Sequence, residues 1–334
     1  MIAKNLQKNN INIIKSNLND ILQETKHTEH KLLNNDLILK LKKCGFDKEA
    51  SSVNGCSSYL KFSVQEHQQT KEQKRRLKDS NFCKWRLCAT CNWRRNININ
   101  KELLSAFESI EATRSVSYLF LTLTIRNPKT SDLKATVKLM NEAFQRMVQT
   151  KAYKDTVIGH FKALELLTEN TKAGEVHPHF HIILIVSSSY FKSPKYLQFE
   201  DWRDMWQKAL RIDYKPTIQV QKIKAKRTRN GKKLTALQSA VFEVAKYSVK
   251  HTDLTKKSNK EFAQIINQTF KMRFFSTGGL LKSMINFQKC DEEFIQAKED
   301  LEKLWIEIYE ELYNWLNGDF CLTKIQQKKL SDEK

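Results

Sequence analysis

Two histidines at the start of an apolar run are the residues of this sequence best suited to chemistry. His179 and His181 open a run of Ile, Leu and Val that continues to Val186 and predicts a buried strand. Because side chains alternate along a strand, both imidazoles lie on the same face. Neutral imidazole is a common ligand of divalent metals, so the pattern predicts a metal site. The alternative is a pair of core histidines that are hydrogen-bonded to the backbone.

A carboxylate on the preceding strand is expected to complete this site. Residues 158–167 predict a strand on which Glu165 shares a face with apolar side chains. A polar loop then leads to the histidines, so the two strands form an antiparallel hairpin that can place Glu165 against His179 and His181. Because an unpaired carboxylate is costly to bury, we interpret Glu165 as the third metal ligand. The alternative is a surface-facing glutamate on an edge strand with a different register.

Three cysteines crowded into one short stretch predict a second metal site. Cys88 and Cys91 form a CxxC pair that can bind one Zn²⁺, and Cys83 supplies a third thiolate. An odd total of seven cysteines favours metal binding over disulfides in a reducing compartment. A structural zinc needs a fourth ligand, and we expect Cys56 to provide it. The other candidates for this ligand are Cys44 and His67, and the alternative to a zinc site is a set of unliganded buried thiols.

A helical face further along the chain offers a nucleophile. Residues 235–250 predict a helix on which Glu243, Tyr247 and Lys250 share one face, at positions i, i+4 and i+7. Beside a metal site, this face would supply a phenol, a carboxylate and a cation. The alternative is a helix with a half-buried tyrosine and a solvated glutamate and lysine.

The balance of charge points to nucleic acid as the partner. The chain of 334 residues carries 58 Lys and Arg against 37 Asp and Glu, which gives a formal net charge of +21. Such an excess favours binding to an anionic polymer. The apolar stretches are too short to span a membrane, and the N-terminal residues lack the apolar core of a signal peptide. We therefore expect a cytoplasmic protein that does not bind membranes.

Basic residues gather in two stretches that are suited to phosphate contact. One stretch flanks the cysteines, and the other contains an Asn230-Gly231 pair that predicts a hairpin turn. The alternatives are solvated surface positions and, for the second stretch, a disordered basic loop. The predicted DNA contacts are Arg75, Arg76, Arg94, Arg95, Lys226, Arg227, Arg229, Lys232 and Lys233.

The sequence predicts four parts along the chain. Residues 1–50 form a polar arm with a short helix, and residues 51–100 form the zinc-binding element. Residues 101–290 contain the strands and the helix of the candidate site. Residues 291–334 are rich in Asp and Glu and carry apolar side chains at helical spacing, which predicts an acidic amphipathic helix and a tail.

Four elements of the sequence resemble those of HUH endonucleases, and in particular those of the replication initiator (Rep) proteins of small rolling-circle plasmids. The cysteine element, Cys-x4-Cys-x2-Cys-x-Trp-Arg-Arg, comes first, and Phe-Leu-Thr-Leu-Thr followed by Arg126-Asn127 resembles the first motif of the family. His-Pro-His-Phe-His at residues 177–181 resembles the HUH motif. The block with Tyr247, and Glu243 four residues before it, resembles the third motif. The resemblance covers about residues 56–281.

The resemblance implies an α+β fold in which a central antiparallel sheet bears the HUH strand and an adjacent helix bears the catalytic tyrosine. The zinc-binding element would precede this domain and the C-terminal helix would follow it. The implied activity is metal-dependent nicking and joining of one DNA strand at the double-strand origin of a plasmid. Tyr247 would form a 5′-phosphotyrosine and leave a 3′-OH primer, Glu243 would activate water at termination, and Lys250 would support the phosphate.

The implied cofactors are Mg²⁺ or Mn²⁺ for catalysis and Zn²⁺ for structure. The implied partners are plasmid origin DNA, with a single-stranded or hairpin nick site, and a host helicase and DNA polymerase. Two other functions stay open at this point. One is a different HUH enzyme, either a mobilisation relaxase or a transposase, and the other is a zinc-containing DNA-binding regulator without catalytic activity.

Overall fold

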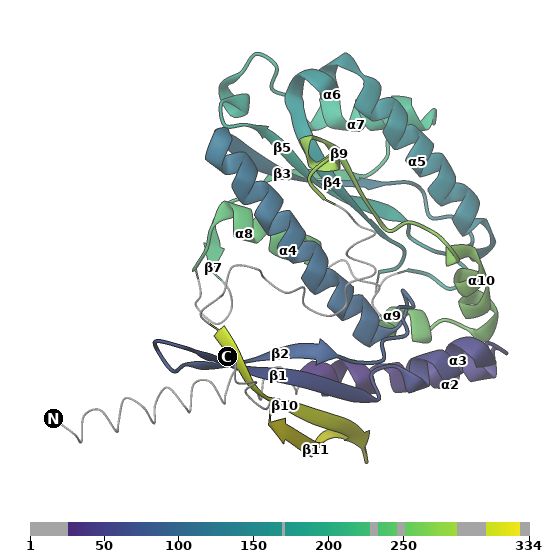
Figure 1. The fold of residues 1–334 in the computed structure, drawn as a ribbon. Helices are drawn as coiled ribbons and strands as arrows, with labels where there is room; N and C mark the ends of the chain where they lie inside the picture. Colours follow the sequence, from purple (N-terminus) through teal and green to yellow (C-terminus); the bar gives the residue numbers. More distant parts are fainter. Residues whose placement is uncertain (1–25, 169–170, 228–232, 246–250, 286–304, 328–334) are drawn as a thin grey trace. The chain divides into compact units, whose positions relative to one another are not determined.

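The chain contains two compact units, each organised around an antiparallel sheet (Figure 1). The computed structural model describes residues 26–168, 171–227, 233–245, 251–285 and 305–327. The first unit combines Met1–Arg94 with Asp291–Lys334, and the second is Arg95–Cys290. The first unit thus contains segments from both ends of the chain. Among the described residues, no helix combines the length and the apolar character needed to cross a membrane.

The sheet of the second unit has five strands in the order β6-β3-β5-β4-β9. The central strand, β5, is buried from His179 to Val186, because both of its faces are covered by helices. It pairs antiparallel with β4, so the hairpin predicted from the sequence is confirmed. The strands of this sheet are β3 (Val116–Thr124), β4 (Val157–Glu165), β5 (His179–Ser187), β6 (Ile218–Lys222) and β9 (Phe275–Gly279).

Helices lie on both faces of this sheet, with α4 and α8 on one face and α5 and α7 on the other (Figure 1). Phe120, Ile183 and Val241 belong to the apolar cluster of the first face. On the second face, the Phe180 ring contacts the rings of Phe144 and Trp206. The helices are α4 (Ala89–Thr113), α5 (Leu133–Gln149), α6 (Lys151–Thr156), α7 (Phe199–Leu210), α8 (Ala236–Ala245), α9 (His251–Thr255) and α10 (Asn259–Thr269), with short 3₁₀ turns η1 (Thr130–Asp132), η2 (Tyr190–Lys192) and η3 (Leu280–Lys282).

Two consecutive glycines allow the edge strand β9 to approach β4 closely. A Cβ atom at Gly278 would lie 2.1 Å from Cε1 of His160, and one at Gly279 would lie 2.3 Å from the carbonyl oxygen of Ile158. Gly279 also has a φ of 58°, which favours glycine. The His160 ring is fixed by the Tyr153 hydroxyl, which lies 2.9 Å from its Nδ1. Burial lowers the pKa of His160 to about 4, so the ring is neutral at physiological pH.

The first unit contains a four-stranded sheet in the order β11-β10-β1-β2. One face of this sheet carries an apolar cluster that includes Phe62, Tyr313 and Phe320. Residues 26–32 are helical. The elements are α2 (Asn34–Lys43), α3 (Asp47–Gly55), β1 (Tyr59–His67), β2 (Gln73–Asp79), β10 (Trp305–Leu316) and β11 (Asp319–Gln327), and a separate pair in the second unit is β7 (Lys226–Arg227) with β8 (Lys233–Leu234).

The predicted acidic amphipathic helix, placed at residues 291–319, is wrong from residue 305 onward, because residues 305–327 form the β10–β11 hairpin. The turn between the strands is Asn317-Gly318, with φ values of 52° and 90°. An Asn-Gly pair at positive φ is the preferred two-residue hairpin turn. This pair was visible in the sequence, but the apolar spacing also fitted a helix. The rest of the predicted helix, up to residue 304, lies outside the described residues.

The glutamates of β10 lie against basic residues of β1 and β2, which explains an acidic strand in this sheet. Lys61 Nζ is 2.6 Å from Glu310 and Arg75 is 2.8 Å from Glu311. Lys78 also pairs with Glu310. These lysines lower the pKa of Glu310 to about 2. The acidic charge of this segment therefore compensates the basic charge of β1 and β2.

Candidate active site

The three predicted ligands of a catalytic metal meet at the end of the β4–β5 hairpin where the connecting loop begins. Glu165 and His179 are directly paired across the ladder, and His181 is the next residue on the same face of β5. The Nε2 atoms of His179 and His181 lie 3.1 and 3.0 Å from the same carboxylate oxygen, Oε2 of Glu165. All three side chains are buried. Their ligand atoms lie within 4.8 Å of one another, which is compatible with one shared cation.

The hydrogen bonds of His179 favour a cation between these three side chains. Its Nδ1 is 2.7 Å from the carbonyl oxygen of His177, and a carbonyl only accepts, so Nδ1 carries a proton. In a neutral ring, the lone pair of Nε2 then faces the Glu165 carboxylate. Burial alone would raise the pKa of Glu165, but the hydrogen bonds and charges of His179 and His181 outweigh it and lower this pKa to about 2. Facing lone pairs repel each other, and a cation or an added proton relieves the repulsion.

Three residues of β3 and the segment after it contact the histidines. Thr122 Oγ1 lies 3.2 Å from Nδ1 of His181, and the Phe120 ring stacks on the His181 ring. Asn127 Oδ1 lies 2.6 Å from Nδ1 of His177. Partners of this kind fix the tautomer and direction of metal-binding imidazoles. Neither Thr122 nor Asn127 is predicted from the sequence as a partner of the histidines, although alternation along the Phe-Leu-Thr-Leu-Thr strand places Thr122 beside them.

The four predicted zinc ligands also meet. The Sγ atoms of Cys56 and Cys91 are 3.5 Å apart, and those of Cys83 and Cys91 are 3.6 Å apart. Cys88 lies 3.6 Å from Cys56. Tetrahedral zinc with Zn–S bonds of about 2.3 Å separates its sulfurs by about 3.8 Å, so the cluster fits this metal. The reserve candidates, Cys44 and His67, are not in the cluster, and the described cysteines form no disulfide.

Polar groups from residues 26–43 surround this cysteine cluster. Lys31 Nζ donates to the carbonyl oxygen of Cys56 at 2.6 Å, and the Asn34 amide donates to the Cys88 sulfur at 3.4 Å. Both side chains are buried. Burial lowers the pKa of Lys31, whereas the nearby thiol groups oppose this shift. A zinc ion with four thiolates carries a net negative charge, which Lys31 would partly offset. These two contacts could not be predicted from the sequence, because Lys31 and Asn34 lie in the polar arm outside any motif.

The helix predicted to bear the nucleophile is described only in part. Its first turns form α8 (Ala236–Ala245), and Leu237, Ala240 and Val241 pack in the same cluster as Phe120 and Ile183. Since Phe120 stacks on His181, α8 covers the face of the sheet that bears the metal-binding side chains. Tyr247 and Lys250 lie outside the described residues, as does the side chain of Glu243. Their roles therefore stay predictions.

Comparison with known proteins identifies the family. The sequence profile of a family described as "Replication protein" matches residues 74–319. The chain belongs to this replication protein family. A "Protein rep" from Lactiplantibacillus plantarum is 34% identical over 253 residues, which cover 73% of this chain and 76% of that protein. A "Protein rep" from Bacillus sp is 33% identical over 218 residues, which cover 63% and 69%.

A third relative is a "Replication protein" from Staphylococcus aureus, 33% identical over 205 residues that cover 59% of this chain and 85% of that protein. The resemblance of the motifs to plasmid replication initiators is thus confirmed at the level of the family. The matched residues include Glu165, His179 and His181 and three of the four clustered cysteines. No solved structure is significantly similar to the chain.

The predicted DNA contacts of this replication protein have different surroundings. Arg94 and Arg95 are buried, with exposed fractions of 5% and 3%, and burial lowers the pKa of Arg94 to about 10. Arg75 is bonded to Glu311 and to the Tyr313 hydroxyl. This placement gives no support to direct phosphate contact by these three residues. Arg76 is half-buried on β2, and Lys233 is exposed on β8. Lys226 and Arg227 form β7, but their side chains lie outside the described part of the chain. Arg229 and Lys232 also lie outside it.

Proposed function

We propose that this replication protein nicks and rejoins one strand of plasmid DNA at the double-strand origin, and so starts rolling-circle replication. The observation that supports the proposal is the convergence of Glu165, His179 and His181 on the sheet face that α8 covers. Buried side chains of this kind, next to the helix that leads to a tyrosine, suit metal-assisted phosphoryl transfer. Family membership supports a role in replication.

Glu165, His179 and His181 would hold the divalent cation, either Mg²⁺ or Mn²⁺. When bound, the cation would polarise the scissile phosphate and offset charge in the transition state. Two imidazole nitrogens and one carboxylate oxygen leave coordination positions for phosphate oxygens and water. Mn²⁺ suits the two nitrogen ligands better than Mg²⁺, which prefers oxygen ligands.

Tyr247 is the proposed nucleophile. Its phenolic oxygen forms a bond to phosphorus, and the bond between phosphorus and the 3′-oxygen breaks. The phenol loses its proton, and the released 3′-oxygen gains one to become the 3′-OH. The product is a 5′-phosphotyrosine that retains the energy of the phosphodiester, so the strand can be rejoined without ATP. The 3′-OH then primes synthesis by a host DNA polymerase, after a host helicase has separated the strands.

Glu243 and Lys250 are proposed to act on the same phosphate. Glu243 precedes Tyr247 by one helical turn and would take a proton from the water that hydrolyses the final intermediate. Lys250 would support the negative charge of the phosphate. The cysteine cluster would hold a structural Zn²⁺ that stabilises the first unit. Exposed basic residues, such as Lys233, would contact the origin DNA.

Nicking of a supercoiled plasmid that carries its own origin tests this proposal. We expect Mn²⁺ to support conversion to the open circle, and EDTA to prevent it. A plasmid of the same size without the origin serves as the control and should stay supercoiled. Equal nicking of both plasmids, or nicking that needs no metal, would contradict the proposed function.

A further inference from the structure

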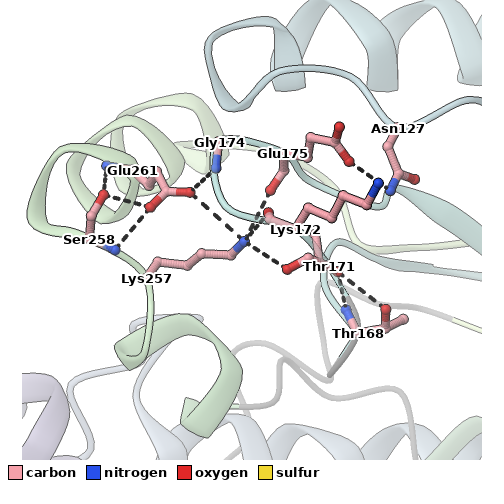
Figure 2. A network of polar contacts seen from close by, with 9 residues as sticks. All are labelled: Asn127, Thr168, Thr171, Lys172, Gly174, Glu175, Lys257, Ser258 and Glu261. Atoms are coloured by element: carbon pink, nitrogen blue, oxygen red, sulfur yellow. Dashed lines mark hydrogen bonds and ion pairs between the residues drawn. The ribbon is translucent and has the colours of Figure 1, made fainter.

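One half-buried lysine holds the loop that joins Glu165 to His179 (Figure 2). Lys257 lies just before α10, and its Nζ donates to three carbonyl oxygens of this loop: those of Thr171 at 3.4 Å, Lys172 at 3.0 Å and Glu175 at 3.1 Å. The Lys257 side chain is only 10% exposed. An ammonium group has three protons, so these three carbonyls use its full capacity to donate.

A glutamate of α10 holds the same loop by its backbone. Glu261 Oε1 accepts from the amide of Gly174 at 2.5 Å, while its Oε2 accepts from the Ser258 amide at 3.0 Å. Lys257 and Glu261 are themselves 3.9 Å apart. Figure 2 shows the two side chains reaching the loop from the same side. The loop is therefore bound through both a donor and an acceptor of its backbone.

The opposite side of the loop is bound by the segment that follows β3. Asn127 Nδ2 donates to Glu175 at 3.2 Å, and its Oδ1 lies 2.6 Å from Nδ1 of His177. The Thr130 amide donates to the carbonyl oxygen of Gly174 at 2.9 Å. Gly174 is thus bonded through its carbonyl to one segment and through its amide to Glu261.

These contacts matter because the metal-binding side chains lie where the β4–β5 ladder ends. The last pair of the ladder is Glu165 with His179, and a long loop follows. The end of a hairpin opens more readily than its middle, since fewer hydrogen bonds must break. Contacts that restrict the loop reduce this opening and keep Glu165 and His179 at one separation.

We propose that Lys257 and Glu261 are positioning residues that fix this loop and thereby set the affinity of the Glu165–His179–His181 site for its cation. The inference rests on the proposed function, because it concerns the same site. Lys257 also follows Tyr247 by only ten residues in the sequence. The contacts therefore tie the segment after the proposed nucleophile to the loop of the metal site.

The test measures the Mn²⁺ dependence of nicking by Lys257→Met, which keeps the length of the side chain but removes its donors. We expect the Mn²⁺ concentration for half-maximal nicking to rise about 10-fold, the lower end of the effect of groups that orient metal ligands. At saturating Mn²⁺, the rate should stay close to that of the wild type. Lys256→Met is the matched control, since Lys256 is the exposed neighbour, and it should behave as the wild type.

Hydrogen exchange provides a readout that does not depend on activity. In Lys257→Met, the amides of Gly174 and Thr130 should exchange faster, whereas amides in the middle of β5 should not. If Lys257→Met does not fold, Glu261→Ala and Glu261→Gln replace it. The glutamine retains an oxygen that accepts from Gly174, so it should raise the Mn²⁺ requirement less than the alanine does.

The two proposals fail in different ways. A wild-type protein that shows no metal-dependent nicking contradicts the proposed function. A wild type that nicks, together with a Lys257→Met variant that has the same Mn²⁺ requirement and the same exchange rates, overturns the positioning role alone. Equal Mn²⁺ requirements for Glu261→Ala and wild type overturn it in the same way.

Discussion

Glu165 and His179 are the last directly paired residues of the β4–β5 ladder, and Oε2 of Glu165 lies 3.1 Å from Nε2 of His179. The pairing depends on register, because a slip of one residue would move one of the two side chains to the other face of the sheet. The same register brings His181 opposite Ala163, a small residue that leaves room beside the carboxylate. The geometry of the candidate site is thus a property of the sheet.

Removal of one histidine should abolish tight binding of the catalytic cation. In His181→Ala, we expect Mn²⁺ affinity to fall by more than the roughly 10–100-fold that is typical when only a supporting partner is lost. Isothermal titration calorimetry with Mn²⁺ measures this. His67→Ala, which changes a histidine outside both clusters, should bind Mn²⁺ as the wild type does. Unchanged affinity in His181→Ala would refute the metal site.

The cysteine cluster should hold about one zinc ion per chain that mild chelation does not remove, because structural zinc sites are closed. Cys88→Ser should lose this zinc, whereas Cys321→Ser, at an exposed position outside the cluster, should keep it. Elemental analysis of natively purified protein checks both variants. The absence of zinc from the wild type would contradict this assignment.

Gly278→Ala should destabilise the second unit, because the new methyl group would overlap the ring of His160. We expect a loss of about 1–3 kcal/mol in the free energy of unfolding, as is typical of overpacking. Urea denaturation measures it. The same change at Gly55, where a Cβ has open space, should cost little. In a His160→Ala background the penalty should shrink, and an undiminished penalty would show that the ring is not the obstacle.

Glu243→Ala should separate initiation from termination. If Glu243 activates water, the variant should still nick and still form the tyrosine adduct, but the final hydrolysis should slow by about 10²–10⁴-fold, the usual contribution of a general base. Plasmid DNA from cells with this variant should then contain run-on multimers. Normal monomer circles would show that Glu243 is dispensable, and loss of nicking itself would point to a role in orienting other groups.

The sequence predicted the parts of the site that follow from local patterns. Alternation placed His179 and His181 on one face, and a polar loop between two apolar runs indicated the hairpin that brings Glu165 to them. The spacing of Cys83, Cys88 and Cys91 identified the zinc-type cluster. Each of these inferences needs only the period of a strand or the reach of a short loop.

Contacts between distant segments could not be predicted in this way. Lys257 bonds residues 82 to 86 positions away in the sequence, and no pattern around it indicates that loop. The charge of Arg94 and Arg95 was evident, but their burial depends on tertiary packing. The β10–β11 hairpin was missed because the apolar spacing of Leu312, Trp315 and Leu316 also fits a helix. The Asn317-Gly318 pair, which forms the turn of the hairpin, was the signal in the sequence that distinguishes the two.

The covalent intermediate provides the most direct test of the proposed function. The wild-type protein and Tyr247→Phe are each incubated with Mn²⁺ and a single-stranded oligonucleotide that spans the plasmid's own nick site and is labelled at its 3′ end. On a denaturing gel, we expect the label to migrate with the wild-type protein and not with Tyr247→Phe, because only a phenolic oxygen can form the phosphotyrosine bond. An equal amount of adduct with Tyr247→Phe would contradict the account.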